Sequence, residues 1–195
     1  MKRFDPDWQN YQNEIKKGVI INGNFEQIFE TIQSAIDAAV DGDILTIIPE
    51  IYEENLTINK SITLKSEDEK NIILDGKKKG PVISIENAGT VSLFNLNLKN
   101  GKAENGGGIF VKNSNLNLEN SIISENLGGG IYSFVSVLKI ENSEIFKNEN
   151  NGNYFGAGLL VNGGDLKLIN SKVFNNSDSQ EEISLNQNSE ILIEN

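Results

Sequence analysis

The sequence lacks the residues on which many active sites depend. Its 195 residues include no cysteine and no histidine, and its single arginine is Arg3. Without cysteine there is neither a disulfide framework nor a thiolate nucleophile, and without histidine the usual general base and metal ligand is missing. A catalytic site would have to be built from carboxylates, lysines, hydroxyls and amides. We therefore expect no metal and no cofactor.

Long hydrophobic runs are missing as well. No apolar stretch approaches the roughly 20 residues that cross a bilayer. Residues 1–7 place an acidic residue and a proline where a signal peptide would carry an apolar segment. By default we expect a cytoplasmic protein without membrane insertion, and export by another route stays open. The formal net charge of -11 creates a field that repels phosphate and polyuronate chains, so nucleic acid is not an expected partner.

A short motif of an apolar residue, a variable residue and an asparagine returns five times along the chain. Its asparagines are separated by 25, 22, 28 and 25 residues, and an aliphatic column recurs about a dozen residues before it. Periods of 20 to 50 residues indicate a solenoid, and alternating apolar residues such as Leu116 and Leu118 indicate short strands. The sequence therefore predicts an all-β solenoid of parallel strands stacked about 4.8 Å apart.

The two columns have different predicted roles. The aliphatic column is expected to point inward as a ladder; it comprises Ile83, Ile109, Ile131, Leu159 and Ile183. The asparagine column is expected to form a structural ladder of turn amides bonded from coil to coil; it comprises Asn95, Asn120, Asn142, Asn170 and Asn195. Glycine triplets at 106–108 and 128–130 lead into strands, which predicts turns with positive φ rather than phosphate loops.

The N-terminal part has a different pattern. Residues 29–40 carry apolar side chains at helical spacing, with Thr31 as a predicted N-cap and Gly42 beyond the end. Such a helix would cap the first coil, because an open solenoid end exposes core and unpaired strand edges. Residues 5–18 predict another short helix. We divide the chain into a helical or strand extension, residues 1–24, and a β-solenoid, residues 25–195, with its capping helix near 31–40.

The stretch "FETIQSAIDAAVDGDILTIIPEIYEENLTINKSITLKS", followed by "NIILDG" and "NGGGI", resembles the pectin-lyase-like superfamily. The resemblance covers about residues 25–195 and implies a right-handed parallel β-helix of about six coils with an N-terminal α-helical cap. It implies no single activity, because this fold hosts lyases, esterases, epimerases, adhesins and noncatalytic binders. The histidine and arginine signatures of the catalytic branches do not occur in this sequence.

Candidates for chemistry are few. Lys102 and Glu104, in a glycine-flanked turn, could act as a lysine base with an acidic partner, but a lysine base needs burial and this turn is expected to be exposed. Asp41, Asp43 and Asp75 lack the alternating oxygen ligands and the bidentate glutamate of calcium loops. We expect these aspartates to form turn hydrogen bonds instead.

Strand parity points to a binding surface. If the aliphatic column faces inward, the residues that follow it face outward, and three adjacent ones are large: Phe110, Tyr132 and Leu160. A contiguous apolar row on a polar, acidic solenoid is typical of a binding site. The alternative is that the long turn 148–156, with Tyr154 and Phe155, folds over this row and buries it.

These patterns predict a noncatalytic binding or scaffold protein that recognises a protein or a neutral glycan on an exposed strand face. The alternative is a polysaccharide lyase or related carbohydrate-active enzyme that uses a lysine base. A third interpretation is an acidic rod that imitates nucleic acid. Self-association, end to end or through a face, would also be compatible with stacked strands.

Overall fold

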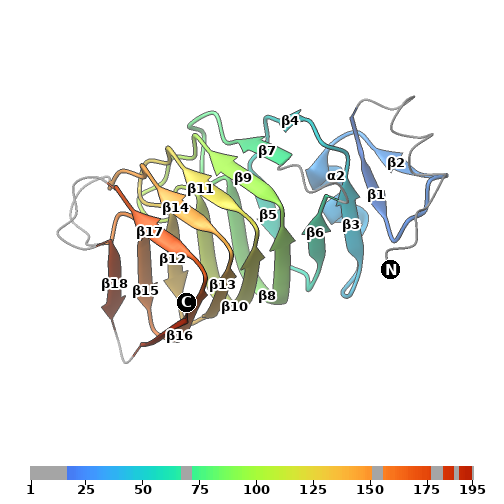
Figure 1. Cartoon of the computed structure of the whole chain (residues 1–195). Coiled ribbons are helices and arrows are strands. Elements are labelled where there is room, and N and C mark those ends of the chain that lie inside the picture. Colours follow the sequence, from blue (N-terminus) through green and yellow to red (C-terminus); the bar gives the residue numbers. More distant parts are fainter. Residues whose placement is uncertain (1–16, 67–71, 151–155, 177–181, 187–188, 195) are drawn as a thin grey trace.

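The computed structural model describes residues 17–66, 72–150, 156–176, 182–186 and 189–194. Over these residues the chain forms an all-β parallel β-solenoid of about five turns with one short helix (Figure 1). The sequence predicted about six coils. The smaller sheet does contain six stacked strands, but the chain makes only five turns in passing from the first of them to the sixth. The helix has seven residues, and no helix in the described part of the chain could cross a membrane.

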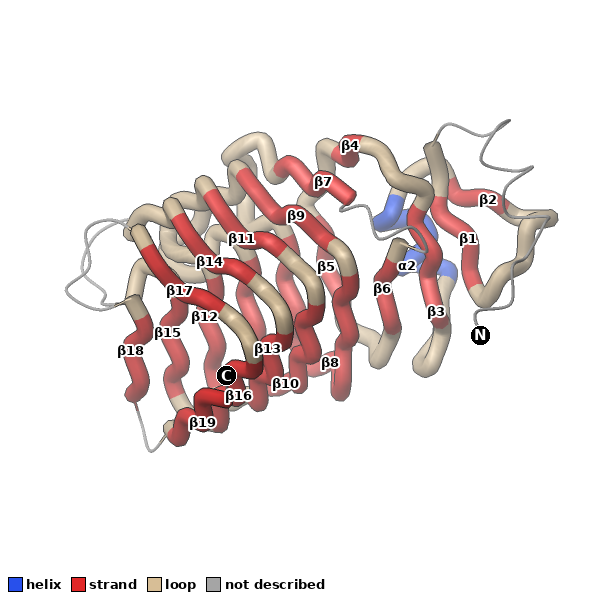
Figure 2. The backbone as a smooth tube through the Cα atoms, viewed as in Figure 1, coloured by secondary structure: helices blue, strands red, loops and turns tan. Residues whose placement is uncertain are grey.

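Each complete coil contributes three strand segments, so the solenoid has three faces (Figure 2). The first face contains β5 (Leu56–Ile58), the first part of β8 (Ile83–Phe94) and of β10 (Ile109–Glu119), β12 (Ile131–Phe134), β15 (Leu159–Asn162) and β18 (Ile183–Asn186). The second face contains β3 (Ile44–Ile47), β6 (Thr63–Lys65), the last parts of β8 and β10, β13 (Val137–Glu141), β16 (Asp165–Ile169) and β19 (Glu190–Glu194). The third face contains β4 (Ile51–Tyr52), β7 (Ile72–Asp75), β9 (Leu96–Lys99), β11 (Ile122–Ser124), β14 (Glu144–Phe146) and β17 (Lys172–Phe174).

The inward aliphatic ladder is confirmed. Its members are paired in register from coil to coil on the first face, although the repeat length varies. Ile83, Ile109 and Leu159 are fully buried, Ile131 is 1 % exposed, and Ile183 packs on the core at the last coil. Like side chains stack because parallel strands set equivalent residues directly above one another.

Residues with positive φ turn the chain at the three corners of the coils. The first corner, between the first and second faces, has Asn87, Asn113, Val135 and Gly163 in this conformation; the second corner has Asn95, Asn120, Asn142 and Asn170; the third has Asn100, Glu125, Lys147 and Asn175. Asparagine is frequent there because its short polar side chain tolerates left-handed backbone. The glycine turns are also confirmed, since φ is positive at Gly106, Gly128 and Gly129.

The asparagine ladder is real, but it lies in a different column from the one predicted. Asn120, Asn142 and Asn170 are exposed corner residues, Asn95 is half-buried, and Asn195 lies outside the described residues. The reason is the left-handed turn itself, which directs these side chains away from the core. The buried amides are those of the third corner, where Nδ2 of Asn126 donates to Oδ1 of Asn148 (2.9 Å) and Nδ2 of Asn148 to Oδ1 of Asn176 (2.9 Å).

A column of serines joins the coils at the second corner. The backbone N–H of Ser121 donates to Oγ of Ser143 (3.1 Å), and that of Ser143 donates to Oγ of Ser171 (3.1 Å). Ser114 and Ser136 repeat the arrangement at the first corner (3.2 Å). Side chains therefore join neighbouring coils at all three corners, because backbone groups at a buried turn need partners.

Helix α2 (Ile32–Ala38) covers the first coil, close to the predicted position. Thr31 is its N-cap, as expected, and accepts from the backbone N–H of Ser34, whereas the C-cap is Ala39 rather than a glycine. Strands β1 (Val19–Ile21) and β2 (Ile28–Phe29) continue this end, and β1 pairs antiparallel with β3. The helix predicted at residues 5–18 falls almost wholly outside the described residues.

Candidate binding surfaces

The predicted apolar row lies in register on the outer side of the first face. Phe110 pairs with Tyr132, and Tyr132 pairs with Leu160. The Phe110 and Tyr132 ring centroids are 5.6 Å apart at an interplanar angle of 34°, and both side chains are partly exposed. Leu160 is only 7 % exposed. The surface offered to a partner is therefore the aromatic pair, with Leu160 beside it as a buried flank.

A small hollow borders this pair where the third-corner turns meet the first face. Tyr132 and Leu160 line it together with Asn105 and three glycines, Gly106, Gly128 and Gly156. A Cβ on Gly106 would lie 2.9 Å from Cβ of Tyr132, so only a glycine lets this turn approach the aromatic row so closely. Of the predicted covering turn 148–156, residues 151–155, including Tyr154 and Phe155, lie outside the described residues.

Lys102 and Glu104 occupy the predicted turn, and both are exposed. The turn is held by its backbone: the N–H of Lys102 donates to Gly80 O (2.8 Å), and Lys102 bridges to Leu127 of the next coil. Within the described residues the two side chains form no ion pair with each other. The structure thus leaves both side chains in solvent.

Two surface features were not predicted from the sequence. The first is an open groove of about 500 Å³ along the third corner, lined by charges of both signs and by amides: Lys78, Lys147, Glu125, Glu149, Asn100 and Asn175. The sequence offered only a weak signal for it, because these residues belong to different coils and meet only when the coils stack. Such a lining can donate and accept hydrogen bonds from a polar, uncharged ligand.

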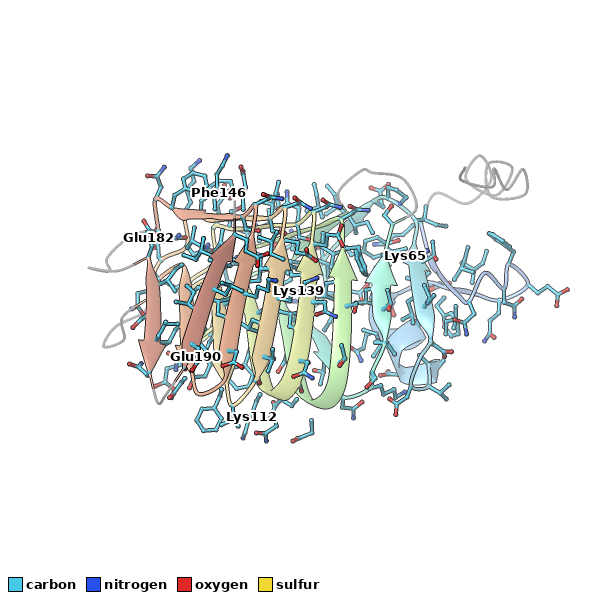
Figure 3. The ribbon with its side chains drawn as sticks, turned by 60° about the horizontal axis from the view of Figure 1, so that its bottom comes forward. Lys65, Lys112, Lys139, Phe146, Glu182 and Glu190 are labelled. Carbon is cyan, nitrogen blue, oxygen red and sulfur yellow. The ribbon has the colours of Figure 1, made fainter. Side chains whose placement is uncertain are left out.

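The second unpredicted feature is another aromatic pair, Phe146 and Phe174, on the third face. Their ring centroids are 5.3 Å apart at 17°, and Nζ of Lys147 lies 5.7 Å from the Phe146 ring centroid. In Figure 3 Phe146 lies along one edge of the view and Lys112, which ends the first-face segment of β10, lies along the opposite edge. The molecule therefore carries two aromatic pairs on separate surfaces.

The aspartates serve turns, as predicted. Oδ1 of Asp41 accepts from the backbone N–H of Ser61 (2.8 Å). Hydrogen bonds from the backbone N–H of Val40 and from Asn22 lower the pKa of Asp43. Burial raises the pKa of Asp75, but hydrogen bonds donated by the Lys77 N–H and by Asn100 more than offset it, so its pKa is below the usual value. In the part of the chain that the structure describes, no three acidic residues gather as metal ligands would.

Comparisons with protein-family models, with curated proteins and with solved structures find no match to this chain.

Proposed function

We propose that this chain is a noncatalytic binding protein, a β-helix of the pectin-lyase-like superfamily, whose partner docks on Phe110 and Tyr132. The observation that supports it is the in-register, partly exposed aromatic pair on the outer side of a rigid parallel sheet. Aromatic anchors bury a large area at little cost in side-chain entropy, and they are enriched where partners bind. The backbone beneath them is fixed by strand pairing on both sides.

The expected partner is a protein with an apolar contact patch. A polyanionic partner is disfavoured by the net charge of -11. A neutral glycan is the second candidate. The observation that favours it is the third-corner groove, whose lysines and glutamates balance one another in charge. The two candidates predict different surfaces, since a protein would use the first face and a glycan the third corner.

The test compares two matched double variants. Phe110→Ser with Tyr132→Ser removes the first-face pair, and Phe146→Ser with Phe174→Ser removes the third-face pair as the control. Both variants should keep the circular dichroism of the wild type, because all four side chains point outward. In a pull-down followed by mass spectrometry, the partner should be lost only with the first-face variant. Capture that survives this variant would overturn the proposal.

A glycan array, run with the same proteins and with Glu125→Gln, decides between the partner classes. Binding of a neutral oligosaccharide that is weakened by Glu125→Gln and unaffected by the first-face variant would favour the groove. No glycan signal together with first-face capture of a protein would favour the protein partner.

The catalytic alternative keeps a direct test. A lyase with Lys102 as base and Glu104 as its partner would release unsaturated product from polygalacturonate or alginate, and Lys102→Ala would abolish it. Both side chains are exposed, and within the described residues they form no ion pair with each other, so we expect no product. Product that disappears in Lys102→Ala would replace the binding function with the lyase.

A further inference from the structure

One coil inside the stack reverses the usual placement of polar and apolar side chains. It runs along β12, round the first corner and into β13, with β10 on one side and β15 and β16 on the other (Figure 1). Inside this coil, Ser133 takes the place that Val111 and Val161 take in the neighbouring coils. The Ser133 hydroxyl is fully buried and forms no hydrogen bond within the described residues, so it weakens the core.

The outer side of the same coil is apolar from the first face round to the second. Tyr132 and Phe134 lie two positions apart on β12, so both point outward, and both are partly exposed. Val135 and Val137 follow at the corner and are 54 % and 45 % exposed. We call these four side chains the corner band. The neighbouring coils carry mostly polar residues or glycine at the equivalent positions: Phe110, Lys112, Asn113 and Asn115 before it, and Leu160, Asn162, Gly163 and Asp165 after it.

Stability of the fold does not explain the corner band. Val135 has φ of 49°, a conformation that a β-branched residue adopts unfavourably. The next coil leaves Val135 uncovered, because its corner residue is Gly163, and a Cβ there would lie 3.6 Å from Cγ2 of Val135. Residues that depart from local rules without a structural benefit gather at functional sites.

Two charged side chains flank the corner band on opposite sides. Lys112 is in register with Phe134 on the β10 side, and Asp165, the first residue of β16, lies beside Val137 on the other side. Among the described residues neither Lys112 nor Asp165 takes part in an ion pair, whereas the lysines of β13 and β16 are paired with glutamates. Charges at the rim of an apolar surface select and orient a partner.

We propose that the corner band is received by an apolar groove of a partner protein, which places an acidic group at Lys112 and a basic group at Asp165. This inference rests on the binding function proposed above and extends its surface from the first face round the first corner. A corner is convex, so a concave partner covers more of it than the convex corner of a second copy would. A neutral glycan would leave Lys112 and Asp165 without opposite charges.

The test is a photo-cross-linking competition in an extract of the cells that make this protein. The probe is the 195-residue chain with p-benzoylphenylalanine in place of Asn115, an exposed residue in register with Val137. We expect a cross-link to one other protein, suppressed by an excess of the wild-type chain. The corner variant, Val135→Asn with Val137→Thr, should compete at least about tenfold less well. It should stay folded, because asparagine suits a left-handed corner and threonine suits a strand.

Matched variants separate docking from stability and charge. Ser133→Val fills the core without changing the surface, so it should stabilise the fold and compete like the wild type. Lys112→Glu and Asp165→Lys should each compete about tenfold less well, whereas Lys65→Glu, on β6, should compete like the wild type. Equal competition by Lys112→Glu and Lys65→Glu would contradict the charge contacts.

The competition also distinguishes this inference from the function proposed above. If the corner variant competes like the wild type while Phe110→Ser with Tyr132→Ser does not, the first-face site stands and the corner band is overturned. If both variants compete like the wild type, both proposals fall. A cross-link only between two copies of the chain, or no cross-link that the wild-type chain suppresses, would also overturn docking of a partner protein on the corner band.

Discussion

Two asparagine columns, six residues apart in the sequence, differ in what their side chains do. Asn142 turns the second corner with φ of 49° and is exposed. Asn148 is fully buried, and its amide bonds to Asn126, to Asn176 and to the backbone oxygen of Ile123. Asn142 thus serves the fold through its backbone conformation, whereas Asn148 serves it through the hydrogen bonds of its side chain.

Substitutions separate these two roles. Asn148→Ala should lower the free energy of unfolding by about 3 kcal/mol, because it leaves several buried groups without partners at about 1 to 3 kcal/mol each. Asn142→Ala should cost about 1 kcal/mol through left-handed strain, and Asn142→Gly should restore the lost stability. Urea unfolding measures all three. Equal losses for Asn142→Ala and Asn148→Ala would show that the exposed column also carries hydrogen bonds.

Val135 is a residue in an unfavourable conformation. It occupies the first corner with φ of 49°, where other coils place Asn87, Asn113 and Gly163. Its side chain is 54 % exposed, so little burial compensates for a β-branched residue in this region. Val135→Asn should therefore raise the free energy of unfolding by about 1 kcal/mol.

Val137 provides the matched control. It is 45 % exposed but lies in strand β13, where a β-branched residue is favoured. Val137→Asn should be neutral or destabilising in the same urea titration. If both substitutions shift the midpoint alike, lost surface hydrophobicity rather than backbone strain is the cause.

At the scale of an element, α2 depends on a residue outside it. Nζ of Lys60 donates to the backbone oxygens of Ile36 (2.9 Å), Asp37 (2.8 Å) and Ala39 (2.7 Å). The last carbonyls of a helix have no partners within the helix, and a cation there also complements the helix dipole. Lys60 therefore does two things: it satisfies the carbonyls at the C-terminal end of α2, and it attaches this end to the solenoid.

Removing this cation tests the attachment. Lys60→Met keeps the aliphatic stem and should cost about 2 kcal/mol of stability, because a charged donor to three carbonyls is lost. The control for the charge change is Lys65→Met, which removes a lysine of β6 and should shift the urea unfolding midpoint little. Hydrogen exchange of the α2 amides should rise in Lys60→Met and not in Lys65→Met. Unchanged exchange in both would mean that the hydrogen bonds of Lys60 do not hold the helix.

For the whole molecule, Tyr52 makes stability depend on alkaline pH. Its side chain is fully buried, and its hydroxyl lies 3.0 Å from the backbone oxygen of Gly18 and 2.9 Å from that of Ile48. Burial raises the pKa of Tyr52 to about 12. The folded state therefore holds this proton more tightly than the unfolded state, whose tyrosine ionises near pH 10.

The stability that the protonated Tyr52 hydroxyl contributes is fully present below pH 10, and it is lost as the pH rises to about 12. A shift of two pKa units corresponds to about 3 kcal/mol. Tyr52→Phe should be less stable than the wild type at pH 8, and the difference should shrink between pH 10 and 12. Comparing the two proteins by urea unfolding at each pH cancels every effect of pH that they share. A constant difference would show that Tyr52 ionises equally in both states.

The inward ladder of the first face was predictable because its signal is local. Apolar alternation sets which side chains face inward, and the spacing of the repeats sets which residues stack, whatever the length of the turns. The helix at Ile32–Ala38 was predictable for the same reason, since Thr31 and the apolar spacing lie within one short segment. The alignment of Phe110, Tyr132 and Leu160 on the outer side of the first face was predictable because successive residues of a strand point to opposite sides of the sheet.

The identity of the buried amide column was not predictable. The steps from Asn120 to Asn142 and from Asn126 to Asn148 are equal, so the sequence cannot distinguish the two columns. Burial is decided by the coils above and below and by the direction in which a left-handed corner sends its side chain. The exposure of Leu160 likewise depends on turns from other coils.

By itself, then, the sequence determined the solenoid, its strand register and the side of each strand that faces the core, because these follow from periodicity. Only the tertiary structure decided which polar residues are buried, that Phe146 and Phe174 meet, and that Ile191 and Ile193 continue the core column into solvent. Those outcomes depend on contacts between residues more than twenty positions apart. Stacking creates such contacts, and no local pattern of the chain contains them.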